Sequence, residues 1–295
     1  MDTFDIAAID GNFGAQISGC DLATGLDAAT FAALARTLYD KRVIVIPEQS
    51  LSQADYLRFG CQWGEPIPHV LDHMRMRGYP QLMTVGNTEE RDRDPLIRNG
   101  AALWHTDQSY ERVPASATML YSIIAPRHGG ETQFCDMRRA YDELDESIRM
   151  RIDSLVVAHK YGAGKRRDDE PPVNPLINER QDQRVPVTYH PLVMAHPVTG
   201  TRALYGLGHG AHGIKGLHDG DADALLEMLK THCAQERFIY RHQYRVGDIV
   251  IWDTLQTMHR ATPIDIASGA DDSRLLWRIS VRGKPSVFDD LVSAV

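Results

Sequence analysis

Two histidines and one aspartate in this sequence are spaced as the protein ligands of a metal ion can be. His105 and Asp107 form an H-x-D tripeptide, and His259 follows much later in the chain. Two imidazoles and one carboxylate can occupy one triangular face of an octahedral ion and leave three positions open, as in non-haem Fe(II) oxygenases. The three residues therefore predict a ferrous ion with room for a cosubstrate and dioxygen.

The H-x-D spacing has a mechanical basis, because positions i and i+2 of a β-strand point to the same side. If residues 101–104 form a strand that runs into the site, His105 and Asp107 aim together from its end. The tripeptide alone is a weak signal, since the chain has 13 histidines among 295 residues. The alternative is an exposed histidine followed by an aspartate in a turn.

Two arginines lie four residues apart after His259. Arg274 and Arg278 would share one face of a strand, and hydrophobic positions alternate with them. Arginines that point into an apolar interior are costly unless each meets an anion, and the guanidinium fork matches a carboxylate well. Two interpretations stay open, namely structural salt bridges with Asp or Glu, and receptors for two acidic small molecules near the metal.

Length and composition limit the class of protein. A chain of 295 residues can form one elaborated domain, and we expect a single domain over 1–295. Cys20, Cys61, Cys135 and Cys233 form no C-x-x-C pair, so reduced cysteines of a cytoplasmic protein are expected. The net charge of −8 argues against a nucleic-acid surface. No segment approaches the roughly 20 apolar residues of a membrane span.

The pattern of expected elements favours a mainly β fold. Helices are expected at 27–40, where Asp27 caps a stripe of Phe31, Leu34 and Leu38, at 52–59, and at 219–232 with Leu225, Met228 and Leu229 on one stripe. Strands are expected at 42–47, 117–124, 154–159, 188–194, 238–242, 248–252 and 275–281. Many strands with few crossover helices favour an antiparallel barrel or sandwich, and a jelly roll with flanking helices fits.

One compositional break interrupts the chain. A charged run followed by two prolines at 165–172 predicts an exposed, mobile loop at about 161–176. The loop is interpreted either as a lid over the site or as a solvated connection.

Four segments together resemble the taurine dioxygenase/2,4-dichlorophenoxyacetate dioxygenase family. They are residues 13–22, the W-H-T-D sequence at 104–107, the G-G-E-T segment within 129–137, and residues 246–253 before His259. The likeness spans nearly the whole chain and is closer to the 2,4-dichlorophenoxyacetate branch, chiefly through 134–138 and 238–242. It implies a double-stranded β-helix (jelly roll, cupin-like) that uses Fe(II), 2-oxoglutarate and O2.

The resemblance assigns roles to individual residues. His105, Asp107 and His259 match the metal ligands of the family. Thr132 and Arg274 match the pair that holds the far carboxylate of 2-oxoglutarate.

Two further positions match residues that contact the primary substrate. Arg278 matches the arginine offered to its anionic group, and His69 lies where the taurine branch has a histidine for the head group. A histidine in a loop can also simply be solvated. Residues 260–273 are about four residues longer than in better-known members, so the assignment rests on the R-x-x-x-R spacing. Arg282 is the rival of Arg278.

The favoured function is hydroxylation of a small organic carboxylate, with release of succinate and CO2. An aryloxyalkanoate is one candidate, because hydroxylation beside its ether oxygen gives a hemiacetal that collapses with ether cleavage. Alternatives are a sulfonate, alkyl sulfate or natural-product carboxylate as substrate, or a metal-binding barrel that is no oxygenase. The Thr132 and Arg274 pair argues against the last. The expected partner is a small anionic molecule, and a homo-oligomer is compatible with the sequence.

Overall fold

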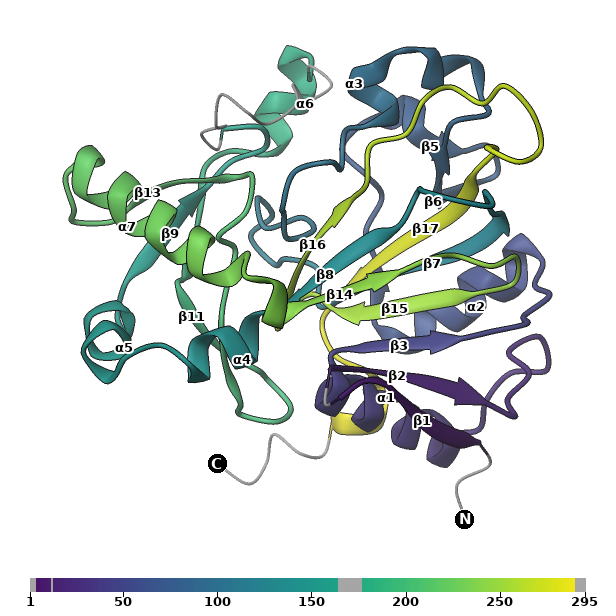
Figure 1. Ribbon diagram of the computed structural model, residues 1–295, viewed down its shortest axis with the longest axis horizontal. Helices are drawn as coiled ribbons and strands as arrows, with labels where there is room; N and C mark the ends of the chain where they lie inside the picture. The colour runs from purple at the N-terminus through teal and green to yellow at the C-terminus, as the bar shows by residue number, and fades with distance from the viewer. Residues whose placement is uncertain (1–3, 12, 164–176, 290–295) are drawn as a thin grey trace.

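The computed structural model describes residues 4–11, 13–163 and 177–289. A nine-stranded sheet dominates it, and all neighbouring strands are antiparallel except β2 and β3. In spatial order its strands are β1 (Asp5–Asp10), β2 (Phe13–Ser18), β3 (Val43–Ile46), β15 (Ile249–Asp253), β7 (Ala117–Ile124), β17 (Leu275–Arg282), β6 (Tyr79–Gly86) and β5 (Arg75–Met76), with β4 (Glu65–Pro66) also on β17. Figure 1 shows these strands stacked on one side of the molecule.

A second, three-stranded sheet closes the barrel. Its order is β14 (Ile239–His242), β8 (Thr132–Asp136) and β16 (Thr257–Ala261), all antiparallel. Phe134 and Tyr240 of this sheet pack in one cluster with Val45, Leu120 and Trp252 of the large sheet. Two sheets with a shared apolar interior form the expected jelly roll, and the prediction of a mainly β fold is confirmed.

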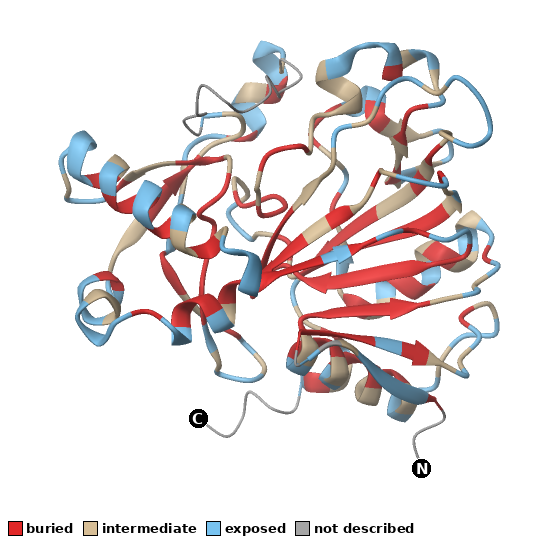
Figure 2. Ribbon diagram, in the orientation of Figure 1, coloured by how far each residue is buried: buried red, intermediate tan, exposed pale blue. Residues whose placement is uncertain are grey.

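Alternation along the strands explains why the large sheet is buried on both faces. Ile249 and Ile251 of β15 belong to the core that also contains residues of helices α1 (Ala28–Lys41) and α2 (Gln53–Trp63). Val250 and Trp252 point to the other face and join the core between the two sheets. Figure 2 shows the central strands buried along nearly their whole length.

The remaining elements form a group beside the barrel, at the left of Figure 1. Its core joins α4, α7, β9, β12 and β13 through buried aliphatic side chains. The elements are α4 (Met137–Asp142), α5 (Glu146–Ile152), β9 (Val156–His159), α6 (Glu179–Arg184), β10 (Thr188–Pro191), β11 (Val193–Ala195), β12 (Arg202–Leu204), β13 (Ala211–Ile214) and α7 (Asp219–Cys233). Above the barrel lies α3 (Pro95–Arg98), and short 3₁₀ helices cover Asp72–Met74, Glu90–Arg93 and Glu236–Phe238.

Several expected elements are confirmed with small shifts. Asp27 caps α1, where its side chain accepts a hydrogen bond of 2.8 Å from the Thr30 N–H, and the strand at 117–124 is β7. The second helix runs past residue 59 to Trp63. It continues because Trp63 is buried, and because Gly60 allows the helix to approach Ile279 of β17 closely.

Two expectations about regular structure are wrong. Residues 101–104 form no strand, because their carbonyls bond outside a ladder: Ala101 accepts from Ala261 and Trp104 from His209, each over 2.8 Å. The predicted strand at 188–194 is two strands. It breaks at Leu192, whose N–H donates to Leu155 and whose carbonyl accepts from Tyr205.

Two smaller points concern single side chains. Met228 of α7 is 38% exposed, so the buried stripe consists of Leu225, Leu226 and Leu229 instead. The four cysteines are free, as expected.

In the part of the chain that the structure describes, no helix is long and apolar enough to cross a membrane. Residues 164–176 of the predicted loop lie outside the described residues.

His159, in β9, is a buried histidine outside the candidate metal site. Neither ring nitrogen has a hydrogen-bond partner among the described residues. Its ring lies against His190 and Tyr205, with centroids 5.3 and 6.1 Å away. Burial, reinforced by His190 and His212, lowers the pKa of His159 from 6.5 to about 3.

This pKa predicts an acid-sensitive fold. Below pH 6.5 the unfolded chain protonates His159 and the folded chain does not, so stability falls by about 1.4 kcal/mol per pH unit towards pH 3. The variant His159→Leu should remove that contribution, so the free energy of unfolding should depend less steeply on pH, by about 1.4 kcal/mol per pH unit. Urea unfolding between pH 7.5 and 5 in EDTA measures it, with His128→Leu at an exposed site as control. An unchanged slope in His159→Leu would contradict the prediction.

Candidate metal centre and substrate pocket

The structure brings together the three predicted metal ligands. His105, Asp107 and His259 each offer a ligand atom, and these atoms lie within 4.8 Å of one another. The His105 Nε2 lies 3.8 Å from Asp107 Oδ1, and the His259 Nε2 lies 3.6 Å from Asp107 Oδ2. The residues come from two distant parts of the chain, so only the folded protein can form this cluster.

Backbone pairing sets the positions of the two histidines. His105 and His259 form an isolated antiparallel bridge in which each N–H donates to the other carbonyl over 2.9 Å. The bridge places their ring centroids 4.1 Å apart. The Nδ1–H of His105 can donate to the Leu103 carbonyl at 2.8 Å, which leaves its Nε2 free to bind a metal. This β-bridge therefore positions His105, which the sequence analysis expected a strand at 101–104 to do.

A glycine lets a neighbouring loop close onto this segment. A Cβ on Gly208 would lie 2.4 Å from the His105 Cα and 2.4 Å from the Trp104 carbonyl oxygen. The next residue, His209, donates its N–H to the same carbonyl over 2.8 Å. The loop between β12 and β13 thus supports the backbone of a candidate metal ligand from outside the barrel.

The electrostatics of the cluster suit a divalent cation. Burial raises the pKa of Asp107, but the charge of Arg278, with the neighbouring rings of His259 and His105, outweighs it and holds that pKa below its usual range. Burial, with His105 beside it, lowers the pKa of His259 to about 3, and burial also lowers the pKa of His105. An ionised carboxylate between two neutral imidazoles is the protonation state that metal ligands require.

The Asp107 carboxylate is shared between two uses. Its Oδ1 accepts a 2.7 Å hydrogen bond from the Arg278 Nη2. Its Oδ2 is buried and has no hydrogen-bond partner among the described residues. Oδ1 is thus held by the arginine on the side of His105, while Oδ2 lies beside His259 and is free to bind a metal.

Arg274 is buried without an anion. The residue is 3% exposed, and its Nε and Nη2 have no hydrogen-bond partner in the described part of the chain. Its guanidinium lies over the Tyr244 ring, 5.4 Å from the centroid, and a Cβ on Gly130 would come within 2.9 Å of its Cδ. A buried charge of this kind is expensive unless an anion binds it. This environment is consistent with the prediction that Arg274 binds an anionic ligand.

Thr132 and Arg274 both contact the side chain of Tyr244. The Thr132 hydroxyl and the Tyr244 hydroxyl are 2.9 Å apart. In the small sheet Thr132 is opposite Ala261, two residues after His259, so Thr132 and His259 share a face. The sequence analysis missed Tyr244, although its position two residues after His242 continues the alternation of the predicted strand.

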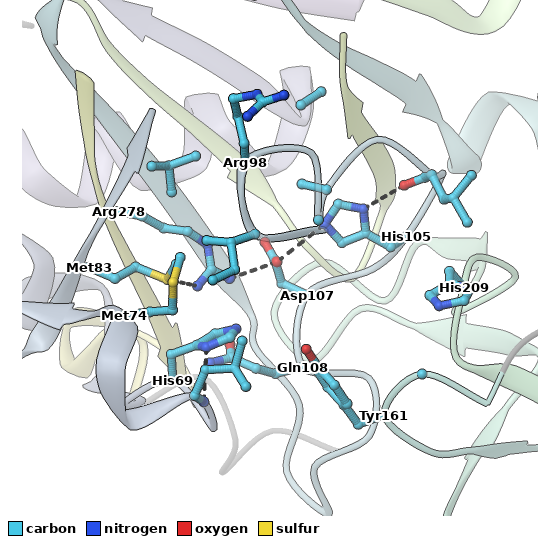
Figure 3. Close-up of a pocket in the computed structure, with 18 of the residues that line it drawn as sticks. His69, Met74, Met83, Arg98, His105, Asp107, Gln108, Tyr161, His209 and Arg278 are labelled. Atoms are coloured by element: carbon cyan, nitrogen blue, oxygen red, sulfur yellow. Dashed lines mark hydrogen bonds and ion pairs between the residues drawn. The ribbon is translucent and has the colours of Figure 1, made fainter. Parts of the chain in front are cut away.

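A cavity of about 160 Å³ opens beside these groups (Figure 3). Its wall includes His105, Asp107, Arg274, Arg278 and His69, and Thr132 contacts Tyr244, over whose ring Arg274 lies. The apolar part of the wall includes Leu71, Met74, Met83, Val85 and Ile97, which pack in one cluster with Tyr110 and Tyr161. The two tyrosine rings meet edge to face at 5.3 Å, and Gln108 and Ser109 add polar groups to the wall.

The three predicted substrate contacts have different positions. Arg278 lines the cavity, but the anion it meets in the structure is Asp107. His69 also lines the cavity, and its Nδ1 accepts from the Leu71 N–H, so a neutral ring carries its hydrogen on Nε2. Burial and the charge of Arg278 lower the pKa of His69 to about 3, so the ring is neutral. Arg282 instead binds exposed Glu65, with its Nε 3.0 Å from the carboxylate.

Two imidazoles and one carboxylate that meet beside a partly apolar cavity are the ligand set of the non-haem Fe(II) oxygenases. Residues 5–280 match the family described as taurine catabolism dioxygenase TauD, TfdA family. The chain belongs to this family and is an alpha-ketoglutarate-dependent dioxygenase, which implies 2-oxoglutarate and O2 as cosubstrates.

Relatives place the chain on the branch that the sequence suggested. It is 31% identical to the (S)-phenoxypropionate/alpha-ketoglutarate-dioxygenase of Sphingobium herbicidovorans, over 96% of both chains. It is 30% identical to the alpha-ketoglutarate-dependent 2,4-dichlorophenoxyacetate dioxygenase of Cupriavidus pinatubonensis, over 87% of this chain and 91% of the relative. The structure of AAD-2 in complex with Mn(II) and N-oxalylglycine is similar, with a TM-score of 0.81, 26% identity, and coverage of 96% and 99%.

Proposed function

We propose that the protein hydroxylates a small organic carboxylate, with an aryloxyalkanoate as the favoured class, and that Fe(II) binds to His105, Asp107 and His259. The observation that carries this proposal is a three-ligand cluster beside a buried arginine. His105 and Asp107 of the cluster line the same cavity as Arg274, whose Nε and Nη2 have no hydrogen-bond partner among the described residues. A barrel protein that only binds a metal, or a metal-dependent hydrolase, has no use for the buried arginine. Residues 1–295 are proposed to form a single dioxygenase domain around this site.

The residues present fit the two absent groups. The unpaired Oδ2 of Asp107 and the free Nε2 of His105 supply ligand atoms suited to Fe(II). The guanidinium of Arg274 and the hydroxyl of Thr132 suit the far carboxylate of 2-oxoglutarate. When bound, iron and 2-oxoglutarate would let O2 oxidise both cosubstrate and substrate: one oxygen atom enters succinate as CO2 is released, and the other hydroxylates a C–H bond.

The primary substrate is held by the other groups of the cavity. Arg278 donates from Nη2 to Asp107 and from Nη1 to the Met83 sulfur, and its other N–H groups can bind the substrate's carboxylate. The neutral His69 offers its Nε2–H as a further donor. The apolar wall around Met74 and Met83 excludes water and orients the chain or ring that follows the carboxylate. In an aryloxyalkanoate this would bring the carbon beside the ether oxygen to the metal.

A sulfonate, an alkyl sulfate or a natural-product carboxylate remains the alternative substrate class. Each carries an anionic group that Arg278 and His69 could bind in the same way. The choice rests on the chain's likeness to dioxygenases named for phenoxypropionate and 2,4-dichlorophenoxyacetate.

A screen of organic acids tests this function directly. Succinate release that depends on Fe(II), 2-oxoglutarate and an added acid is expected, with aryloxyalkanoates ahead of sulfonates and alkyl sulfates. The variant Arg278→Met should lower kcat/KM for the acid by about 30-fold or more, the loss expected when a buried charge pair is broken. Its binding of 2-oxoglutarate should survive.

Direct binding measurements separate the possible failures of that variant. Mn(II) titration shows whether Asp107 still binds metal without its arginine partner. If Arg278→Met loses 2-oxoglutarate binding instead, the roles of Arg274 and Arg278 are exchanged. If no acid supports succinate release above the background, the proposed substrate class is wrong.

A further inference from the structure

The amide of Gln108 is buried in the cavity wall without a partner. The residue is 3% exposed, and neither its Nε2 nor its Oε1 has a hydrogen-bond partner among the described residues. It directly follows Asp107 and lines the cavity, where Figure 3 labels both residues on the same loop. The amide belongs to no part of the proposed iron or 2-oxoglutarate site.

The backbone holds Gln108 in an unusual conformation. Its φ is +49°, in the left-handed region that few residues other than glycine adopt. Its carbonyl accepts a 2.9 Å hydrogen bond from the Glu111 N–H, which closes the turn after the metal ligand. The position of the side chain is therefore set by the same turn that carries Asp107.

A buried primary amide without partners is a costly arrangement. Leaving a buried donor or acceptor unpaired costs the full desolvation of that group, and Gln108 presents both. The apolar wall of Leu71, Met74 and Met83 can satisfy neither atom. Both amide atoms are covered in the ligand-free protein, and because Gln108 lines the cavity, rotation about its side-chain bonds can turn them towards a bound molecule.

We infer that the Gln108 amide selects substrates with a second polar group that both donates and accepts a hydrogen bond, such as a hydroxyl or a carboxamide. This inference rests on the proposed function, in which Arg278 and His69 bind the substrate's carboxylate. A hydroxyl satisfies the amide's N–H and its carbonyl at once. A halogen or a methyl group at the same place satisfies neither, and a second carboxylate leaves the Gln108 carbonyl unpaired.

The test measures the binding of matched acids to two forms of the enzyme. The protein is loaded anaerobically with Mn(II) and 2-oxoglutarate, and Kd is measured for phenoxyacetate and its 2-, 3- and 4-hydroxy derivatives. One hydroxy derivative should bind wild type at least about 10-fold more tightly than phenoxyacetate, since a site built to bind a hydroxyl rejects the analogue without it. In Gln108→Met, a variant of similar side-chain length, the preference should fall below about 3-fold.

Controls make the outcome specific. Ser109→Ala removes a neighbouring hydroxyl of the cavity wall and should keep the preference. Phenoxyacetate itself should bind Gln108→Met at least as tightly as wild type, because no amide is then left unpaired. Circular dichroism establishes that each variant is folded. A preference that is absent in wild type, or equal in wild type and Gln108→Met, would overturn the inference.

Succinate release with the same four acids separates this inference from the proposed function. A Gln108-dependent preference in binding without turnover of any acid leaves the inference standing and removes the function. Turnover without that preference does the reverse. If none of the four acids binds, both are overturned.

Discussion

Replacing Arg274 by methionine is expected to destroy tight 2-oxoglutarate binding and to stabilise the ligand-free protein at the same time. The guanidinium is 3% exposed and has no carboxylate partner among the described residues, so its burial is compensated only when an anion binds. Loss of such a buried charge contact costs 2 kcal/mol or more, which raises the Kd of 2-oxoglutarate by about 30-fold or more. Without ligand the variant should unfold at higher urea, with about 1 kcal/mol more stability.

Two measurements check the expected loss of 2-oxoglutarate affinity and the expected gain in stability. Binding of 2-oxoglutarate to the Mn(II)-loaded protein gives the Kd, and urea unfolding of the ligand-free protein gives the stability. Arg282→Met serves as the matched control, since that arginine pairs with exposed Glu65 and should change neither value appreciably. A variant Arg274→Met that binds 2-oxoglutarate as wild type does would remove the main support for the proposed function.

Replacing His259 by alanine is expected to abolish metal binding and all substrate turnover. His259 is one of three residues whose ligand atoms lie within 4.8 Å of one another. Substitution of a residue that merely orients a metal ligand costs 10- to 100-fold in affinity, so loss of a ligand itself should cost more than about 100-fold. Fe(II) affinity and the weak visible charge-transfer band of the anaerobic Fe(II) and 2-oxoglutarate complex report the loss.

A histidine of the same cavity provides the comparison. His69→Ala should keep the metal and the charge-transfer band, and lose only affinity for the primary substrate. If His259→Ala binds Fe(II) as tightly as wild type, the three residues are no metal centre and the proposed mechanism is wrong.

The two arginines illustrate what spacing can and cannot predict. Arg274 and Arg278 have equivalent positions four residues apart, so both interpretations, salt bridge and ligand receptor, stayed open. The fold gives each a different environment. Asp107 reaches Arg278 from a distant segment, whereas Arg274 lies against Tyr244 and Gly130 and forms no ion pair within the described part of the chain. This difference depends on long-range contacts that no local pattern contains.

Two of the strands that the sequence analysis missed, β8 and β16, carry predicted site residues. In β3, β7 and β15 the β-branched and aliphatic runs predicted the strands correctly. β8 and β16 are interrupted by polar residues such as Thr132, Gln133 and Arg260, so they lack such a run. Site residues break the usual strand composition, so local rules fail at the place where function is concentrated. Gln108 was missed for a related reason, since only its neighbours reveal that its amide is unpaired.

Directed evolution of the enzyme towards new acids has unequal freedom around the cavity. Met74 and Met83 are flexible side chains, so varying them can reshape the space while the backbone stays in place. Position 208 offers no such freedom, because any side chain there would collide with the main chain of His105. Libraries that extend from the lining residue His209 to position 208 would therefore lose members through damage to the metal centre, whatever substrate they were selected on.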